Sequence, residues 1–208
     1  MQNNQGINLQ KGSVVDLQKV NGEKLKTICI GLNWGAIEKK IFFGLIPSKE
    51  SVDLDSSVAI FDDHKMLLDQ VYYGKLGSHD DAIKHSGDDS EGDRFGDDGV
   101  DNEVIVVDLE KIGKKTEQIV FFLNSFRGQD FGDIPYSKIR IYEGTPSTVN
   151  TVFATFNLSA EQDYKGKVSM VMGKLFREDG YWKFKTIGEA LESKRIPGTI
   201  QIIQESFL

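Results

Sequence analysis

Cysteine and proline are scarce in this chain, with one cysteine and four prolines among 208 residues. A lone cysteine, Cys29, excludes an internal disulfide, so a hydrophobic core must hold the fold, and a chain of this length can bury one. Because Cys29 lies in an apolar run, we expect it to be a small buried side chain. Residues 1–12 contain neither the basic nor the apolar segment of a secretion signal, and we therefore predict a cytoplasmic protein.

Long apolar runs and excess positive charge are also missing. No run approaches the ~18 residues that a membrane-spanning helix needs, so no membrane span is expected. The formal net charge is −7 at pH 7. Direct nucleic-acid binding is disfavoured, because phosphate contacts need clustered Lys and Arg. An acidic chain is better suited to metal ions or basic partners.

Helix signals are few and short. One turn could begin at Ser159, with Gln162 three residues later, and a second candidate covers 188–194. Neither could connect parallel strands. Short runs rich in Val, Ile, Phe and Tyr instead alternate with turn signals such as Asn21-Gly22. We predict an all-β antiparallel β-sandwich with a few short helices and long acidic loops, with a hairpin at 168–187 and strands at 27–32, 58–61, 104–107, 119–123, 139–142, 152–156, 168–175, 182–187 and 200–203.

Residues 79–103 depart from the strand pattern because carboxylates and glycines dominate them. Glycines at 87, 92, 96 and 99 would let the backbone turn tightly around one point. Carboxylates about 5 Å apart repel by ~3 kcal/mol at an effective dielectric of about 20, so an ordered loop would need a cation. A solvated, disordered acidic tract is the ordinary alternative. The candidate oxygen donors are Asp80, Asp81, Asp88, Asp89, Glu91, Asp93, Asp97, Asp98, Asp101 and Glu103.

A second acidic motif, VDLDSS at 52–57, argues against mere disorder. It leads into a predicted strand, where Asp53 and Asp55 would point the same way. Two carboxylates on one strand face are tolerable only beside a cation or at a solvated edge. Oxygen donors without cysteine or paired histidine favour a hard ion, and flexible coordination favours Ca²⁺ over Mg²⁺. The EF-hand pattern fits in neither register tested, starting at Asp88 or at Asp89.

These segments together resemble the TerD family of bacterial tellurium-resistance and stress proteins. The resemblance covers about residues 7–192 and leaves 193–208 as a C-terminal extension of a single domain spanning 1–208. It is carried by the order and spacing of GLNWG at 31–35, SVDLDSS at 51–57, HSGDDSEGDRFGDDG at 85–99, FGDIPYSKIRIYE at 131–143 and FREDGYWKFKTIGEAL at 176–191.

The resemblance implies a non-enzymatic, calcium-binding β-sandwich that acts in stress response and tellurium resistance. It also implies partners among other Ter-family proteins, in a membrane-associated complex. The family's DLD motif matches Asp53 and Asp55, and its GD(D/N) motif matches Asp88 and Asp89. Its GDD motif matches Asp97 and Asp98.

Two alignments remain open where the family places Glu directly after GDD. In one, a four-residue insertion separates Asp98 from Glu103, which takes the role of the family's Glu. In the other, counting back from the strand sets Asp101-Asn102-Glu103 on the family's DDE. The predicted Ca²⁺ ligands are therefore drawn from Asp53, Asp55, Asp88, Asp89, Asp93, Asp97, Asp98, Asp101 and Glu103.

Catalytic signatures are missing from the sequence, which contains no GxSxG, GxxxxGK or HExxH motif. His64, His79 and His85 are expected at the surface or in loops. The alternative function is a metal-dependent phosphoester hydrolase that uses the same carboxylates. Trp34 and Trp182 are expected in the core. Phe95 could either be exposed for contact with a partner or pin the acidic loop to the core.

Overall fold

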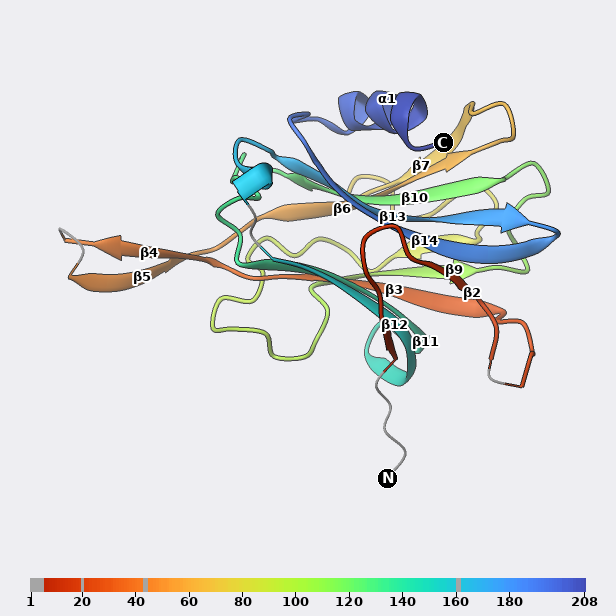
Figure 1. Cartoon of the computed structure of the whole chain (residues 1–208), viewed down its shortest axis with the longest axis horizontal. Helices are drawn as coiled ribbons and strands as arrows, with labels where there is room; N and C mark the ends of the chain where they lie inside the picture. Colours follow the sequence, from red (N-terminus) through yellow and green to blue (C-terminus); the bar gives the residue numbers. More distant parts are fainter. Residues whose placement is uncertain (1–5, 20, 43–44, 160–161) are drawn as a thin grey trace.

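Two β-sheets packed face to face form the body of the protein, and an α-helix lies on the outer face of one of them (Figure 1). The structure is a computed structural model and describes residues 6–19, 21–42, 45–159 and 162–208. Within these residues the fold is the predicted all-β sandwich. No helix of the described residues is long and apolar enough to cross a membrane.

Each main sheet has six strands, and all neighbouring pairs are antiparallel except β1 with β12. Sheet A has the order β1 (Ile7–Asn8), β12 (Thr148–Ser159), β11 (Tyr136–Thr145), β3 (Thr27–Trp34), β9 (Glu103–Asp108) and β8 (Ile83–His85). Sheet B has the order β2 (Val14–Asp16), β14 (Tyr181–Leu191), β13 (Ser169–Glu178), β10 (Gln118–Ser125), β6 (Leu54–Phe61) and β7 (Leu67–Val71).

Strand β10 contains a continuous run of apolar residues, without alternating polar ones, because both of its faces are buried. Ile119 and Phe121 face the core between the sheets, whereas Val120 and Phe122 face the cluster beneath α1 (Ile196–Ser206). A strand buried on both faces has no position for a solvated polar side chain. The predicted positions of Cys29 and Trp34 are confirmed, because both side chains are fully buried. Trp182 is only partly buried and packs against the edge of the core.

The predicted strand at 200–203 is wrong, because these residues lie in α1. Pro197 stands in the first turn of the helix, where its fixed φ is already helical and its missing N–H costs nothing. Ile200 and Ile203 then lie one turn apart and pack together on sheet B. The short apolar run was ambiguous between a strand and a buried helix face.

The helix predicted at 188–194 is also wrong, because β14 continues to Leu191, which pairs with Ser169 of β13. The predicted β-hairpin is confirmed as β13 and β14 joined at Asp179 and Gly180. The turn predicted to begin at Ser159 partly falls outside the described residues, since residues 160–161 are not described. A 3₁₀ helix, η1, follows at Gln162–Tyr164, and Ser159 itself ends β12.

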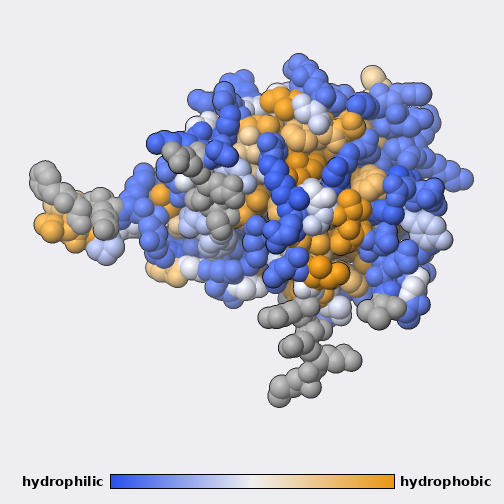
Figure 2. Space-filling view, viewed as in Figure 1, coloured by the Kyte–Doolittle hydropathy of each residue, from blue (hydrophilic) through white to orange (hydrophobic). Residues whose placement is uncertain are grey.

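A two-stranded hairpin of β4 (Ile37–Ile41) and β5 (Ile46–Glu50) projects from one end of the sandwich (Figure 1). Apolar side chains are exposed at its far end (Figure 2), where Phe42 is 69% and Leu45 82% exposed. Among the described strands, β4 and β5 pair only with each other. Ile37, at the base of the hairpin, belongs to the main core, whereas the far end of the hairpin extends away from it.

The contact between α1 and sheet B can be tested at Ile203, which is fully buried. Ile203→Ala should lower the free energy of unfolding by about 2–5 kcal/mol, because it leaves a cavity against sheet B. Gln201→Ala, on the exposed side of the same helix, should change it by less than about 0.5 kcal/mol. Urea denaturation of both variants measures the difference. Equal effects would show that the helix does not pack as described.

Candidate metal centre

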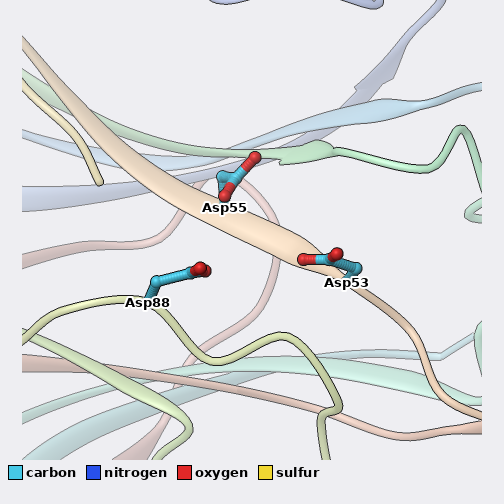
Figure 3. Close-up of side chains that lie close together, drawn as sticks. All are labelled: Asp53, Asp55 and Asp88. Carbon is cyan, nitrogen blue, oxygen red and sulfur yellow. The ribbon is translucent and has the colours of Figure 1, made fainter. Parts of the chain in front are cut away.

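Three carboxylates converge where β6 leaves its partner strand (Figure 3). Strand β7 ends at Val71, opposite Val58, so the first residues of β6 have an edge that no described strand pairs with. Asp53 and Asp55 lie at this edge, and Asp88 approaches them from the acidic loop. One oxygen from each of the three lies within 4.8 Å of the others. One Ca²⁺ ion, with oxygen ligands at about 2.3–2.6 Å, could bridge such a separation.

Electrostatic repulsion inside this group is large because two of its members are buried. Asp53 is 6% and Asp55 5% exposed. Burial, together with the charges of Glu103, Asp53 and Asp88, raises the pKa of Asp55 to about 7. Burial also raises the pKa of Asp53, although the Arg127 guanidinium 3.0 Å away opposes the shift. The two buried carboxyl groups therefore favour a proton or a nearby cation.

Glu103, the first residue of β9, joins sheet A to this edge of sheet B. Its fully buried carboxylate accepts hydrogen bonds from the backbone N–H of Ser56 at 2.8 Å and from that of Asp89 at 3.1 Å. The Glu103 side chain thus gives the Ser56 N–H the acceptor that a neighbouring strand would otherwise provide. The same carboxylate fixes the start of the acidic loop, and its negative charge contributes to the raised pKa of Asp55.

His85 was expected at the surface or in a loop, and that prediction is wrong, because it ends β8 and its side chain is fully buried. Its Nδ1 accepts the N–H of Gly87 at 3.0 Å, which places the ring proton on Nε2. The sequence signal for this burial was the position of His85 two residues after apolar Ile83, because residues two apart share one face of a strand. The other two histidines, His64 and His79, have exposed side chains, as predicted.

Ser56, His85 and Glu103 contain the residue types of a hydrolytic triad but not its geometry. Ser56 Oγ and Glu103 Oε2 both approach Nε2 of His85, at 2.7 and 3.4 Å. In a triad the nucleophile and the carboxylate occupy opposite ring nitrogens. All three side chains are also closed to solvent. We therefore assign this trio to holding the two sheets together.

Asp93 lies away from the three converging carboxylates and anchors the acidic loop to sheet A. Its carboxylate accepts hydrogen bonds from Tyr136 Oη at 2.6 Å, Asn33 Nδ2 at 3.0 Å and Asn102 Nδ2 at 3.1 Å. Burial and the Asp93 charge raise the pKa of Tyr136 far above its usual range, so its hydroxyl remains a donor. The donors around Asp93 already satisfy its oxygens.

The remaining predicted ligands are engaged elsewhere. Asp97 pairs with Lys138 at 2.7 Å, and Asp101 pairs with Arg140 at 2.8 Å. Asp101 packs directly over Gly31, where any Cβ would overlap the Asp101 carboxylate. This contact explains the first glycine of GLNWG. Asp98 and Asp89 bond to backbone N–H groups of their own turns.

The two alignments left open by the sequence correspond to different parts of the structure. Asp101 and Asn102 lead directly into β9, and Asn102 accepts the N–H of Trp34 at 2.8 Å. Asp97 and Asp98 lie earlier, in an exposed part of the loop. Glu103 is the residue of this stretch that contacts the segment carrying Asp55. Phe95 is 91% exposed, so its side chain does not pin the loop to the core.

The bridging role of Glu103 can be tested by removing its carboxylate. Glu103→Ala should lower the free energy of unfolding by about 3 kcal/mol, because the buried N–H of Ser56 and the partly buried N–H of Asp89 lose their acceptor. Glu110→Ala removes an exposed carboxylate that pairs with Lys26 on the surface, and it should cost less than about 1 kcal/mol. Both are measured by urea denaturation in one buffer. Similar losses for the two variants would contradict the bridge.

The raised pKa of Asp55 predicts an unusual dependence of stability on pH. When a chelator keeps metal ions away, Asp55 in the folded protein holds its proton up to about pH 7, whereas in the unfolded chain its carboxyl group has the ordinary pKa of 3.8. Its contribution to folding therefore becomes less favourable as pH rises from about 4 to 7, by at most ~1.4 kcal/mol per pH unit. Urea denaturation across this range should show a slope that Asp55→Asn reduces, because the raised pKa of Asp53 contributes a slope of the same sign. An unchanged slope in Asp55→Asn would exclude this carboxyl as the source.

Comparisons with known proteins agree on one family. The TerD domain model matches residues 5–199. Tellurium resistance protein TerZ of Serratia marcescens is 31% identical over 191 residues, which cover 91% of this chain and 93% of TerZ. Stress response protein SCP2 of Bacillus subtilis is 30% identical over 206 residues, covering 93% of this chain and 97% of SCP2. These relatives are named for resistance and stress response.

A solved structure shares the fold. It is a homologue of telluride resistance protein TerD from Streptomyces coelicolor A3(2), with a TM-score of 0.61 and 16% sequence identity. The match covers 83% of this chain and 94% of that one. At this identity the likeness concerns the fold alone.

Proposed function

This chain belongs to the TerD domain family, and from that premise we propose that it is a calcium-binding, non-enzymatic protein of the bacterial stress response, implicated in tellurium resistance. The observation that carries the calcium proposal is the convergence of Asp53, Asp55 and Asp88 within 4.8 Å. At an effective dielectric of about 20, each pair of charges at this separation repels by ~3 kcal/mol. A divalent cation would reverse the sign of that interaction.

The chemistry of these donors fits a hard cation. All three are carboxylates, and neither Cys29 nor His85 is positioned to supply a softer ligand, since both are buried in other contacts. Asp55 in β6 and Asp53 just before it are buried, whereas Asp88 comes from a loop and is exposed. A site that joins rigid and adaptable donors suits the variable coordination of Ca²⁺ better than the strict octahedron of Mg²⁺.

The residues around the cluster would couple binding to loop position. Asp88 is followed by Asp89, whose N–H is bonded to Glu103, and Glu103 is bonded in turn to Ser56 beside Asp55. Holding Asp88 against β6 would therefore order the beginning of the acidic loop. The exposed side chain of Phe95 in the same loop is available to a partner, and we propose other Ter-family proteins in the cytoplasm as the partner class.

Calcium titration of chelator-treated protein tests the proposal. We expect heat of binding by calorimetry and a higher melting temperature. Linkage gives ~2.7 kcal/mol of stabilisation at one hundred times the dissociation constant. Asp88→Asn removes an exposed member of the cluster and should weaken binding by about tenfold or more.

Asp98→Asn is the matched control, because it removes an exposed carboxylate of the same loop outside the cluster. It should leave calcium affinity within about twofold of the wild-type value. Absence of heat together with an unchanged melting temperature would refute the calcium proposal. A larger loss in Asp98→Asn than in Asp88→Asn would place the ion elsewhere in the loop.

A further inference from the structure

A cavity of about 430 Å³ lies beside the acidic cluster, between the edge of sheet B and the N-terminus of α1. Its volume is within the range typical of small-molecule sites. The residues that line it come from β6, from β7 and β10 with the residues that follow each, and from the start of the helix with the residues before it. It is separate from the cluster except for Asp55, which lines both.

One wall of the cavity is aromatic. Tyr73 packs edge-on against Tyr72, with ring centroids 5.4 Å apart, and against Phe126, with centroids 6.3 Å apart. Phe126, directly after β10, is 65% exposed, and Tyr73, shortly after β7, is 43% exposed. Partly exposed aromatic rings gathered at a cavity offer a surface on which a planar ligand can pack.

Another wall carries positive charge. Lys194 and Arg195 are both exposed, and neither has an ion-pair partner among the described residues. Arg195 is the N-cap residue of α1 and supplies no side-chain cap to the helix. The positive end of the 11-residue helix therefore adds to the charge of the two side chains. This wall favours an anionic group.

The sheet side of the cavity presents hydrogen-bond acceptors. Asp55 and Asn124 are paired across β6 and β10, and Asn124 faces α1, where its Nδ2 donates to Thr199 Oγ1 at 3.0 Å. Asn124 is 3% exposed, and its Oδ1 has no hydrogen-bond partner among the described residues. An unsatisfied buried acceptor is costly, so a ligand that donates to this side would be favoured.

We propose that this cavity binds a small aromatic organic anion, with its ring against Tyr73 and Phe126 and its anionic group against Lys194 and Arg195. A hydroxyl or amino group of the ligand faces Asn124 and Asp55. The Asp55 carboxylate repels an anion from its own side and so orients the ligand. The aromatic and basic walls lie outside the metal cluster, which shares only Asp55 with the cavity, so the proposal can be tested without calcium.

Calorimetric titration of the full chain with 4-aminophenyl phosphate tests the proposal. We expect one saturable site, and inorganic phosphate, which lacks the ring, should bind at least about tenfold more weakly. Phe126→Ala should weaken 4-aminophenyl phosphate binding by about tenfold. Phe42→Ala is its control, because Phe42 is an equally exposed phenylalanine on the distant β4–β5 hairpin.

The role of the basic wall is tested with two double variants that change the net charge of the protein by the same amount. Lys194→Glu with Arg195→Glu should weaken binding by at least about tenfold. Lys114→Glu with Lys115→Glu, on an exposed loop that does not line the cavity, should leave it within about twofold. Thermal melting verifies that each variant is folded.

Absence of saturable binding by the wild-type chain would overturn the proposal. Equal weakening by the two double variants, or equal affinity for inorganic phosphate, would also overturn it. Asp88→Asn separates this proposal from the calcium proposal, because Asp88 does not line the cavity. With calcium removed by a chelator, unchanged 4-aminophenyl phosphate binding in that variant is the expected result.

Discussion

The buried carboxylate of Glu103 is the interaction on which the rest of the site depends. It lies at the start of a strand in sheet A and bonds to the backbone of a strand in sheet B and to the acidic loop. A fully buried acidic side chain is tolerated only where it has strong donors. Glu103 has them because β6 extends beyond β7 and leaves the N–H of Ser56 without a strand partner.

The same free edge explains why acidic side chains gather there. Residues of β6 that lack a neighbouring strand can hold carboxylates at the margin of the core, and the acidic loop fills the gap with Asp88. The opposite end of that loop is attached separately, through Asp93 to Tyr136 and through Asp101 to Arg140. Most of its carboxylates therefore have structural partners, whereas Asp88 faces Asp53 and Asp55.

Asp55 connects two features that the sequence presents as unrelated. It belongs to the carboxylate cluster on one side and to the cavity at the start of α1 on the other. A backbone hydrogen bond also links the two places, because the N–H of Phe126, at the cavity, donates to the carbonyl oxygen of Asp53, in the cluster, at 2.9 Å. The charge state of one aspartate can therefore influence both places without any large movement of the fold.

The sequence by itself determined the all-β class, the main strands, the hairpin at Asp179-Gly180 and the placement of Asp53 and Asp55 together at the start of one strand. These features follow from local rules: side-chain alternation, turn residues and apolar runs. The strand prediction at 200–203 was wrong because the short apolar run there is compatible with both a helix and a strand.

Only the tertiary structure decided which carboxylates meet. Asp88 and Asp97 have similar glycine-rich surroundings in the sequence, yet Asp88 faces β6 and Asp97 faces Lys138. That difference arises from contacts between residues far apart in the chain, and charge spacing within the loop does not encode it. The buried position of His85 and the role of Glu103 were settled in the same way, by the packing of one sheet against the other.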